Sequence, residues 1–106
     1  MIIELNNTSA LKNINHYSLK ALFYIYKEHR DDKVFSEIYK RTYDNLFDIV
    51  LSKVPTSNEA CILVQEVFRI TRISLNRFEK EQCAIKYLTR VADGCFLNYS
   101  DKIRQA

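Results

Sequence analysis

The chain has very few of the residues that form tight turns. Its 106 residues include one glycine, Gly94, and one proline, Pro55. A β-rich domain of this length needs many tight turns, and such turns depend heavily on these two residue types. The scarcity of both therefore argues against a sheet and favours long helices joined by short polar loops.

The lack of glycine and histidine also excludes several kinds of ligand site. Phosphate-cradling loops and dinucleotide fingerprints need several positions without a side chain, and only Gly94 qualifies. The two histidines, His16 and His29, have no histidine or carboxylate partner at the four-residue spacing of a helical zinc site. We therefore expect the protein to use no cofactor and no metal.

The sequence also contains no recognisable catalytic arrangement. No serine, threonine or cysteine is paired in sequence with a base that would activate it as a nucleophile. Asp44 and Asp48 lie four residues apart, but Lys40 and Arg41 accompany them on a face that we expect to be solvated. The chain is therefore predicted not to be an enzyme, with no catalytic residues.

The chain has few cysteines, and their pattern indicates a reducing compartment. Cys61, Cys83 and Cys95 are odd in number, lie in apolar stretches and lack the close spacing of a zinc knuckle or redox motif. We expect reduced thiols packed as small hydrophobic side chains, as in a cytoplasmic protein. We expect no signal peptide and no membrane-spanning segment, and therefore no membrane partner.

The remaining composition is that of one globular domain. Hydrophobic residues make up 47% and charged residues 27%, with a net charge of +3. This length suits one core, so residues 1–106 are expected to form a single helical domain. Isoleucine, asparagine, lysine and tyrosine are abundant and have AT-rich codons, which favours an AT-rich source such as a phage or mobile element.

Apolar residues recur at helical spacing in four segments. The predicted fold is all-α, a compact bundle of four to five helices in antiparallel helical hairpins, with the first two helices in one hairpin and the last two in another. The last two could also be continuous. The expected helices cover residues 16–30, 33–52, 57–74 and 77–93.

Capping residues set the expected ends of these helices. Asn13 or Asn15 is a candidate N-cap for the first helix. One of the two aspartates at 31–32 is the candidate N-cap for the second helix. Thr56 and Glu59 have the spacing of a capping box before the third helix. Gly94 suits a C-terminal cap for the fourth, after which residues 95–97 could fold back against the core.

The outer face of the third helix is the candidate site for binding a partner. Isoleucines on a polar face, with arginine between them, are typical of an interface, although flanking helices of the same bundle could also cover them. We expect a non-catalytic protein-binding module, such as an inhibitor, immunity protein or adaptor, whose partner is another protein or a second copy. The candidate residues are Ile62, Glu66, Arg69, Arg72 and Ile73.

Two other surfaces remain open as alternatives. Tyr43, Phe47 and Leu51 widen the apolar side of the second helix and form the next candidate interface. The stretch 67–92 carries an excess of basic over acidic side chains, so the alternative function is a small regulator that binds nucleic acid. Its basic residues are Arg69, Arg72, Arg77, Lys80, Lys86 and Arg90, against Glu79 and Glu81.

Overall fold

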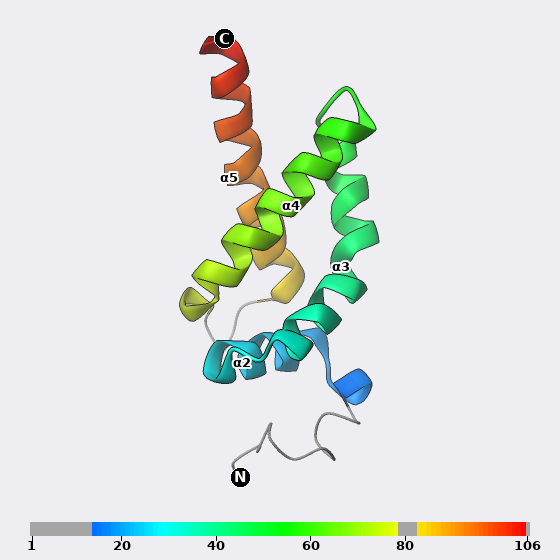
Figure 1. The fold of residues 1–106 in the computed structure, drawn as a ribbon, viewed down its shortest axis with the longest axis vertical. Helices are drawn as coiled ribbons and strands as arrows, with labels where there is room; N and C mark the ends of the chain where they lie inside the picture. Colours follow the sequence, from blue (N-terminus) through cyan, green and yellow to red (C-terminus); the bar gives the residue numbers. More distant parts are fainter. Residues whose placement is uncertain (1–13, 79–82, 106) are drawn as a thin grey trace.

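Every regular element in the described part of the chain is helical. The computed structural model describes residues 14–78 and 83–105 (Figure 1). The expected all-α fold is confirmed. The elements are η1 (Ile14–His16), α2 (Leu19–His29), α3 (Asp32–Leu51), α4 (Ser57–Ser74), η2 (Leu75–Arg77) and α5 (Ala84–Gln105).

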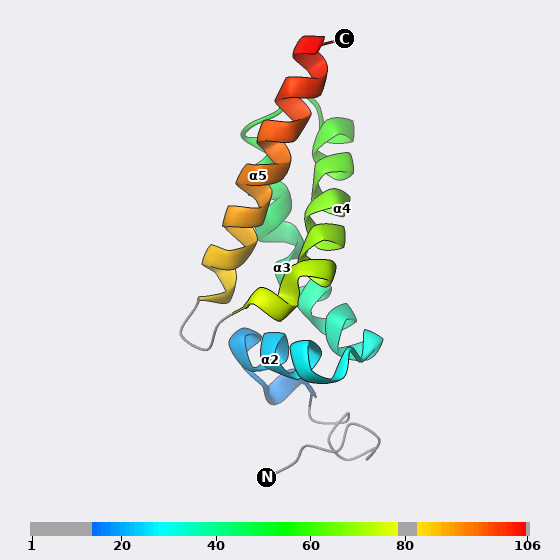
Figure 2. The same cartoon turned by 90° about the vertical axis from the view of Figure 1, so that its left-hand side faces the viewer.

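Helices α3, α4 and α5 run up, down and up along the long axis of the molecule (Figures 1 and 2). The antiparallel hairpins are therefore α3/α4 and α4/α5. Helix α2 lies across the lower end of these three helices and does not pair lengthwise with α3, so the predicted hairpin of the first two helices is wrong. The turn between α2 and α3 uses Arg30, whose left-handed backbone (φ 54°, ψ 35°) redirects the chain immediately before Asp31 caps α3.

An aromatic cluster holds α2 against the end of the bundle. The ring of Phe23 on α2 lies 5.1 Å from Phe78, which follows η2, and 6.2 Å from Tyr87 on α5. The Phe78 and Tyr87 rings are 5.6 Å apart, and all three pairs meet edge to face. Lys27 adds a 2.7 Å hydrogen bond from Nζ to the carbonyl oxygen of Phe78. Segments distant in sequence thus determine the position of α2.

The N-cap predictions are confirmed for two helices and wrong for one. Helix α4 covers the expected residues, and Thr56 Oγ1 accepts a hydrogen bond from the Glu59 amide at 3.2 Å. Asp31 caps α3. Helix α2 is instead capped by Ser18, which accepts from the Ala21 amide at 3.1 Å, because the helix begins later than residue 16. Asn15 lies in η1, and Asn13 lies outside the described residues.

The expected end of the fourth helix at Gly94 is wrong. Helix α5 begins at Ala84 and continues through Gly94, whose φ is not positive, as far as Gln105. The helix continues through Gly94 because its buried stripe also continues past this residue. Ala92 and Cys95 lie on either side of Gly94, and both pack into the core. Residues 95–97 therefore stay helical. Helices α4 and α5 are separate elements, since η2 ends α4.

The packing prediction for cysteine holds for one residue of three. Cys95 is buried, whereas Cys61 and Cys83 are exposed: Cys61 lies on the outer side of α4, and Cys83 immediately precedes α5. All three are free thiols. Among the described residues, no helix is both long enough and apolar enough to cross a membrane.

Candidate protein-binding surface

The outer face of α4 exposes two large apolar side chains. Ile62 is 63% exposed and Ile73 is 62% exposed, so the bundle's own helices do not cover them. The two lie eleven residues apart, or three helical turns, and therefore fall on one line along the helix. Glu66 and Arg69 lie between them on the same line. We call Ile62, Glu66, Arg69 and Ile73 the α4 ridge.

The charged residues of the α4 ridge pair with each other. Arg69 Nε lies 2.5 Å from Glu66 Oε1, and the two side chains are 60% and 41% exposed. An exposed ion pair of this kind contributes little to folding stability, because water and salt screen it. The pair is consequently free to exchange partners at low cost when another charged surface approaches.

Arg72 belongs to a different environment from the other four candidates. Its Nε donates to Tyr26 Oη at 3.0 Å, its guanidinium pairs with Asp32, and its Cζ lies 5.7 Å from the centre of the Phe35 ring. Its carbonyl oxygen also accepts a hydrogen bond from Arg30 at 2.5 Å. These contacts join α4 to α2 and to the start of α3, so Arg72 stabilises the packing of these helices.

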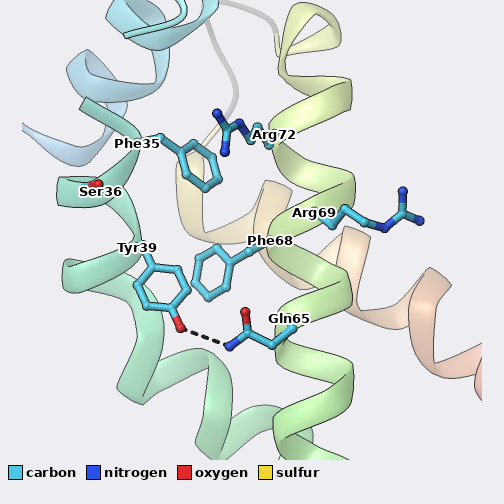
Figure 3. Close-up of a pocket in the computed structure, with 7 residues that line it drawn as sticks. All are labelled: Phe35, Ser36, Tyr39, Gln65, Phe68, Arg69 and Arg72. Atoms are coloured by element: carbon cyan, nitrogen blue, oxygen red, sulfur yellow. Dashed lines mark hydrogen bonds between the residues drawn. The ribbon is translucent and has the colours of Figure 1, made fainter. Parts of the chain in front are cut away.

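A groove of about 390 Å³ lies between α3 and α4 (Figure 3). The rings of Tyr39 and Phe68 are 4.4 Å apart in this groove, and Gln65 Nε2 donates to Tyr39 Oη at 3.0 Å. Arg72 points toward Phe35, whereas the Arg69 guanidinium points away from the groove. The full lining is Phe35, Ser36, Tyr39, Gln65, Phe68, Arg69 and Arg72.

The sequence analysis did not predict this groove, because an apolar stripe along a helix is expected to face the core. Phe35 and Tyr39 share the apolar stripe of α3, and Phe68 is a buried residue of α4. The available signal was the four-residue spacing of aromatic side chains along α3, from Phe35 through Tyr39 to Tyr43 and Phe47. Such spacing places successive rings next to one another on one face.

The second candidate surface, Tyr43 with Phe47 and Leu51, is less exposed than the α4 ridge. The Tyr43 and Phe47 rings stack with centroids 6.0 Å apart and planes 18° apart, and both side chains are half-buried. Desolvation, followed by the neighbouring Cys61 thiol, raises the pKa of Tyr43. Leu51 is 36% exposed, so this flank offers less free apolar surface.

A second recess, of about 250 Å³, lies between α4 and α5 on the other side of the α4 ridge. Three ridge residues contribute to it: Ile62, Glu66 and Arg69. The α4 ridge therefore continues into a depression, lined by both apolar and polar side chains, that a protruding side chain could enter. The lining is Ile62, Leu63, Glu66, Arg69, Ile70, Cys95, Asn98 and Tyr99.

Polar side chains elsewhere are dispersed over the surface. His16, His29, Asp44 and Asp48 are all exposed. Within residues 14–78 and 83–105, no cluster of three or more histidine, cysteine or acidic side chains could hold a metal ion. Of the basic stretch, Arg77, Lys86 and Arg90 are exposed, while Glu79, Lys80 and Glu81 lie outside the described residues.

The α4 ridge combines exposed apolar side chains with an ion pair, a mixture common in protein interfaces. The groove lies on one side of this ridge and the recess on the other, so the surface is not flat. No family model matches this chain, and no curated protein or solved structure matches it.

Proposed function

We propose that the chain is a non-catalytic protein-binding module of the inhibitor, immunity-protein or adaptor type. It binds through the α4 ridge and occludes a surface of its partner. The observation that carries this proposal is the exposure of Ile62 and Ile73, at 63% and 62%. Burying an isoleucine against a partner contributes roughly 1.5–3 kcal/mol, whereas exposing it to water brings no benefit to folding.

The arrangement of these side chains supports the choice of surface. Leu97 on α5 is also 61% exposed, but single exposed apolar residues are common on soluble proteins. The α4 ridge differs because two such residues share one line, with an arginine between them. Arginine is enriched in interfaces, and apolar anchors beside it supply much of the binding energy.

Nucleic-acid binding remains the alternative, and two ion pairs weigh against it. Arg69 pairs with Glu66, and Arg72 pairs with Asp32, so two basic groups already have carboxylate partners. Glu66 and Asp32 neutralise these two arginines, so this surface attracts a phosphate backbone less than its basic residues alone would. With a net charge of only +3, the chain has little further attraction for a polyanion.

The proposed setting is a reducing cytoplasm. Three free thiols, two of them exposed, support this assignment, because exposed cysteines in oxidising compartments tend to form disulfides. The abundance of residue types with AT-rich codons supports a phage or mobile-element source. Small occluding proteins of this kind need no active site, which accords with the dispersed polar side chains.

The test compares the native chain with the double variant Ile62→Asp/Ile73→Asp. Each protein is immobilised and incubated with a lysate of the cells that express it, and captured proteins are identified by mass spectrometry. The identified partner is then purified and its affinity measured by calorimetry. We expect the double variant to lose at least about 100-fold in affinity, since two buried anchors are replaced by charges.

The matched control is Ile85→Asp on α5, where the native side chain is 42% exposed. This variant should keep full affinity for the partner. Both variants should retain the helical circular dichroism spectrum and melting temperature of the native chain. Equal affinity of the native chain and the double variant would refute the α4 ridge as the binding surface.

A further inference from the structure

The α4 ridge has a spacing that helices use to pair with one another. Its residues lie at intervals of four, three and four, the spacing of the a and d positions in a coiled-coil seam. The ridge is also symmetrical about the point between Val67 and Phe68. Ile62 and Ile73 are equidistant from that point, and so are Glu66 and Arg69.

This symmetry makes the ridge complementary to itself. If two copies of α4 pack antiparallel about a two-fold axis at that point, Ile62 of each copy faces Ile73 of the other. Glu66 of each copy then faces Arg69 of the other, so both charged contacts are attractive. A parallel arrangement would instead place Glu66 against Glu66 and Arg69 against Arg69.

We infer that the occupant of the α4 ridge is a second copy of this chain, bound antiparallel through α4. The inference rests on the proposed function, since it names the partner of the same surface. The two Glu66–Arg69 contacts replace the pair that each copy makes alone, so few charges lose a partner. Burial of four isoleucines, two from each copy, drives the association.

The position of the ridge permits this contact. In Figure 1, α4 passes in front of α5, and both ridge isoleucines are exposed. The recess between α4 and α5 includes Ile62 and Ile70, and Ile73 of the second copy can pack against these two side chains. The central charges set the register and the antiparallel direction, as a polar residue does in a coiled-coil seam.

The interface is expected to be small. An 18-residue helix is roughly 27 Å long, and contact along one such helix lies at the lower end of specific interfaces. The chain should therefore dimerise in a concentration-dependent manner, with a micromolar dissociation constant. A foreign partner that uses the ridge would compete with the second copy.

Charge reversal followed by mixing tests the inferred pairing. Sedimentation equilibrium is measured for the native chain and for the single variants Glu66→Arg and Arg69→Glu, up to about 500 µM. Each single variant places like charges opposite one another twice, and its self-association should weaken at least tenfold. In an equimolar mixture of the two variants, every facing pair is again Arg with Glu, so a heterodimer should form with an affinity close to that of the native homodimer.

Matched controls are Lys40→Glu and Asp44→Lys, which reverse exposed charges four residues apart on α3. Both should dimerise like the native chain. Three results would overturn the inference: a monomeric native chain at the highest concentration, single variants that dimerise normally, or a mixture that stays monomeric. A monomeric native chain that still loses a foreign partner on Ile62→Asp/Ile73→Asp substitution would overturn the homodimer alone and leave the proposed function standing.

Discussion

Arg72 on α4 donates a hydrogen bond from Nε to Tyr26 Oη on α2 across 3.0 Å. Tyr26 is only 2% exposed, so its hydroxyl depends on a partner within the protein. The same guanidinium pairs with Asp32 at the start of α3. Arg72, which the sequence indicates as a candidate binding residue, therefore connects α2, α3 and α4.

Replacing Tyr26 with phenylalanine should destabilise the fold without changing its core packing. The ring is retained, but Arg72 Nε loses its acceptor, and we expect the free energy of unfolding to fall by about 1 kcal/mol. Urea denaturation followed by circular dichroism measures this change. The control is Arg69→Ala, which removes an exposed ion pair and should cost no more than about 0.5 kcal/mol. Equal stability of Tyr26→Phe and the native chain would show that the contact contributes nothing.

Replacing Gly94 with alanine should stabilise the protein. Gly94 is helical, and an added Cβ would meet no atom within 4 Å. Alanine in a helix interior is more favourable than glycine by up to about 1 kcal/mol, so thermal unfolding should shift upward. A left-handed cap at this position would reverse the sign, since alanine disfavours that conformation. A lowered melting temperature would therefore contradict the continuous α5.

Cys83 should react faster with iodoacetamide than Cys95 near neutral pH. The backbone amides of Lys86 and Ile85, at the start of α5, lower the pKa of the Cys83 thiol, so more thiolate is present at pH 7. Burial raises the pKa of Cys95 and also shields it from the reagent. Time-resolved peptide mapping by mass spectrometry follows both sites. Comparable labelling rates for Cys83 and Cys95 would contradict this order.

Nucleic acid should bind weakly or not at all. Fluorescence anisotropy with DNA and RNA oligonucleotides at physiological salt should give no dissociation constant below the micromolar range, because Arg69 and Arg72 are already paired. A binder that neutralises several phosphates would lose affinity steeply as salt rises. Nanomolar, salt-sensitive binding that disappears on charge reversal at Arg69 and Arg72 would favour the alternative function.

Much of α4 followed from local sequence signals. The hydroxyl of Thr56 and the amide of Glu59 are three residues apart, so their hydrogen bond depends on little beyond the first turn of the helix. The stripe of α4 that recurs at helical spacing, which includes Leu63, Val67 and Thr71, is buried. Helical periodicity alone determines which of these residues share a face. The direction of Ile62 and Ile73 away from that face follows from the same periodicity.

Tertiary structure decided what covers each face and where α5 ends. Whether Ile62 remains exposed depends on where α3 and α5 pack around α4, which no local pattern specifies. The position of α2 depends on Phe23 meeting Phe78 and Tyr87, three residues from distant segments. Gly94 stays helical because burial of the stripe on either side outweighs the weak helical preference of glycine. Local signals act over one or two turns, whereas the covering of a face requires segments that meet only in the folded chain.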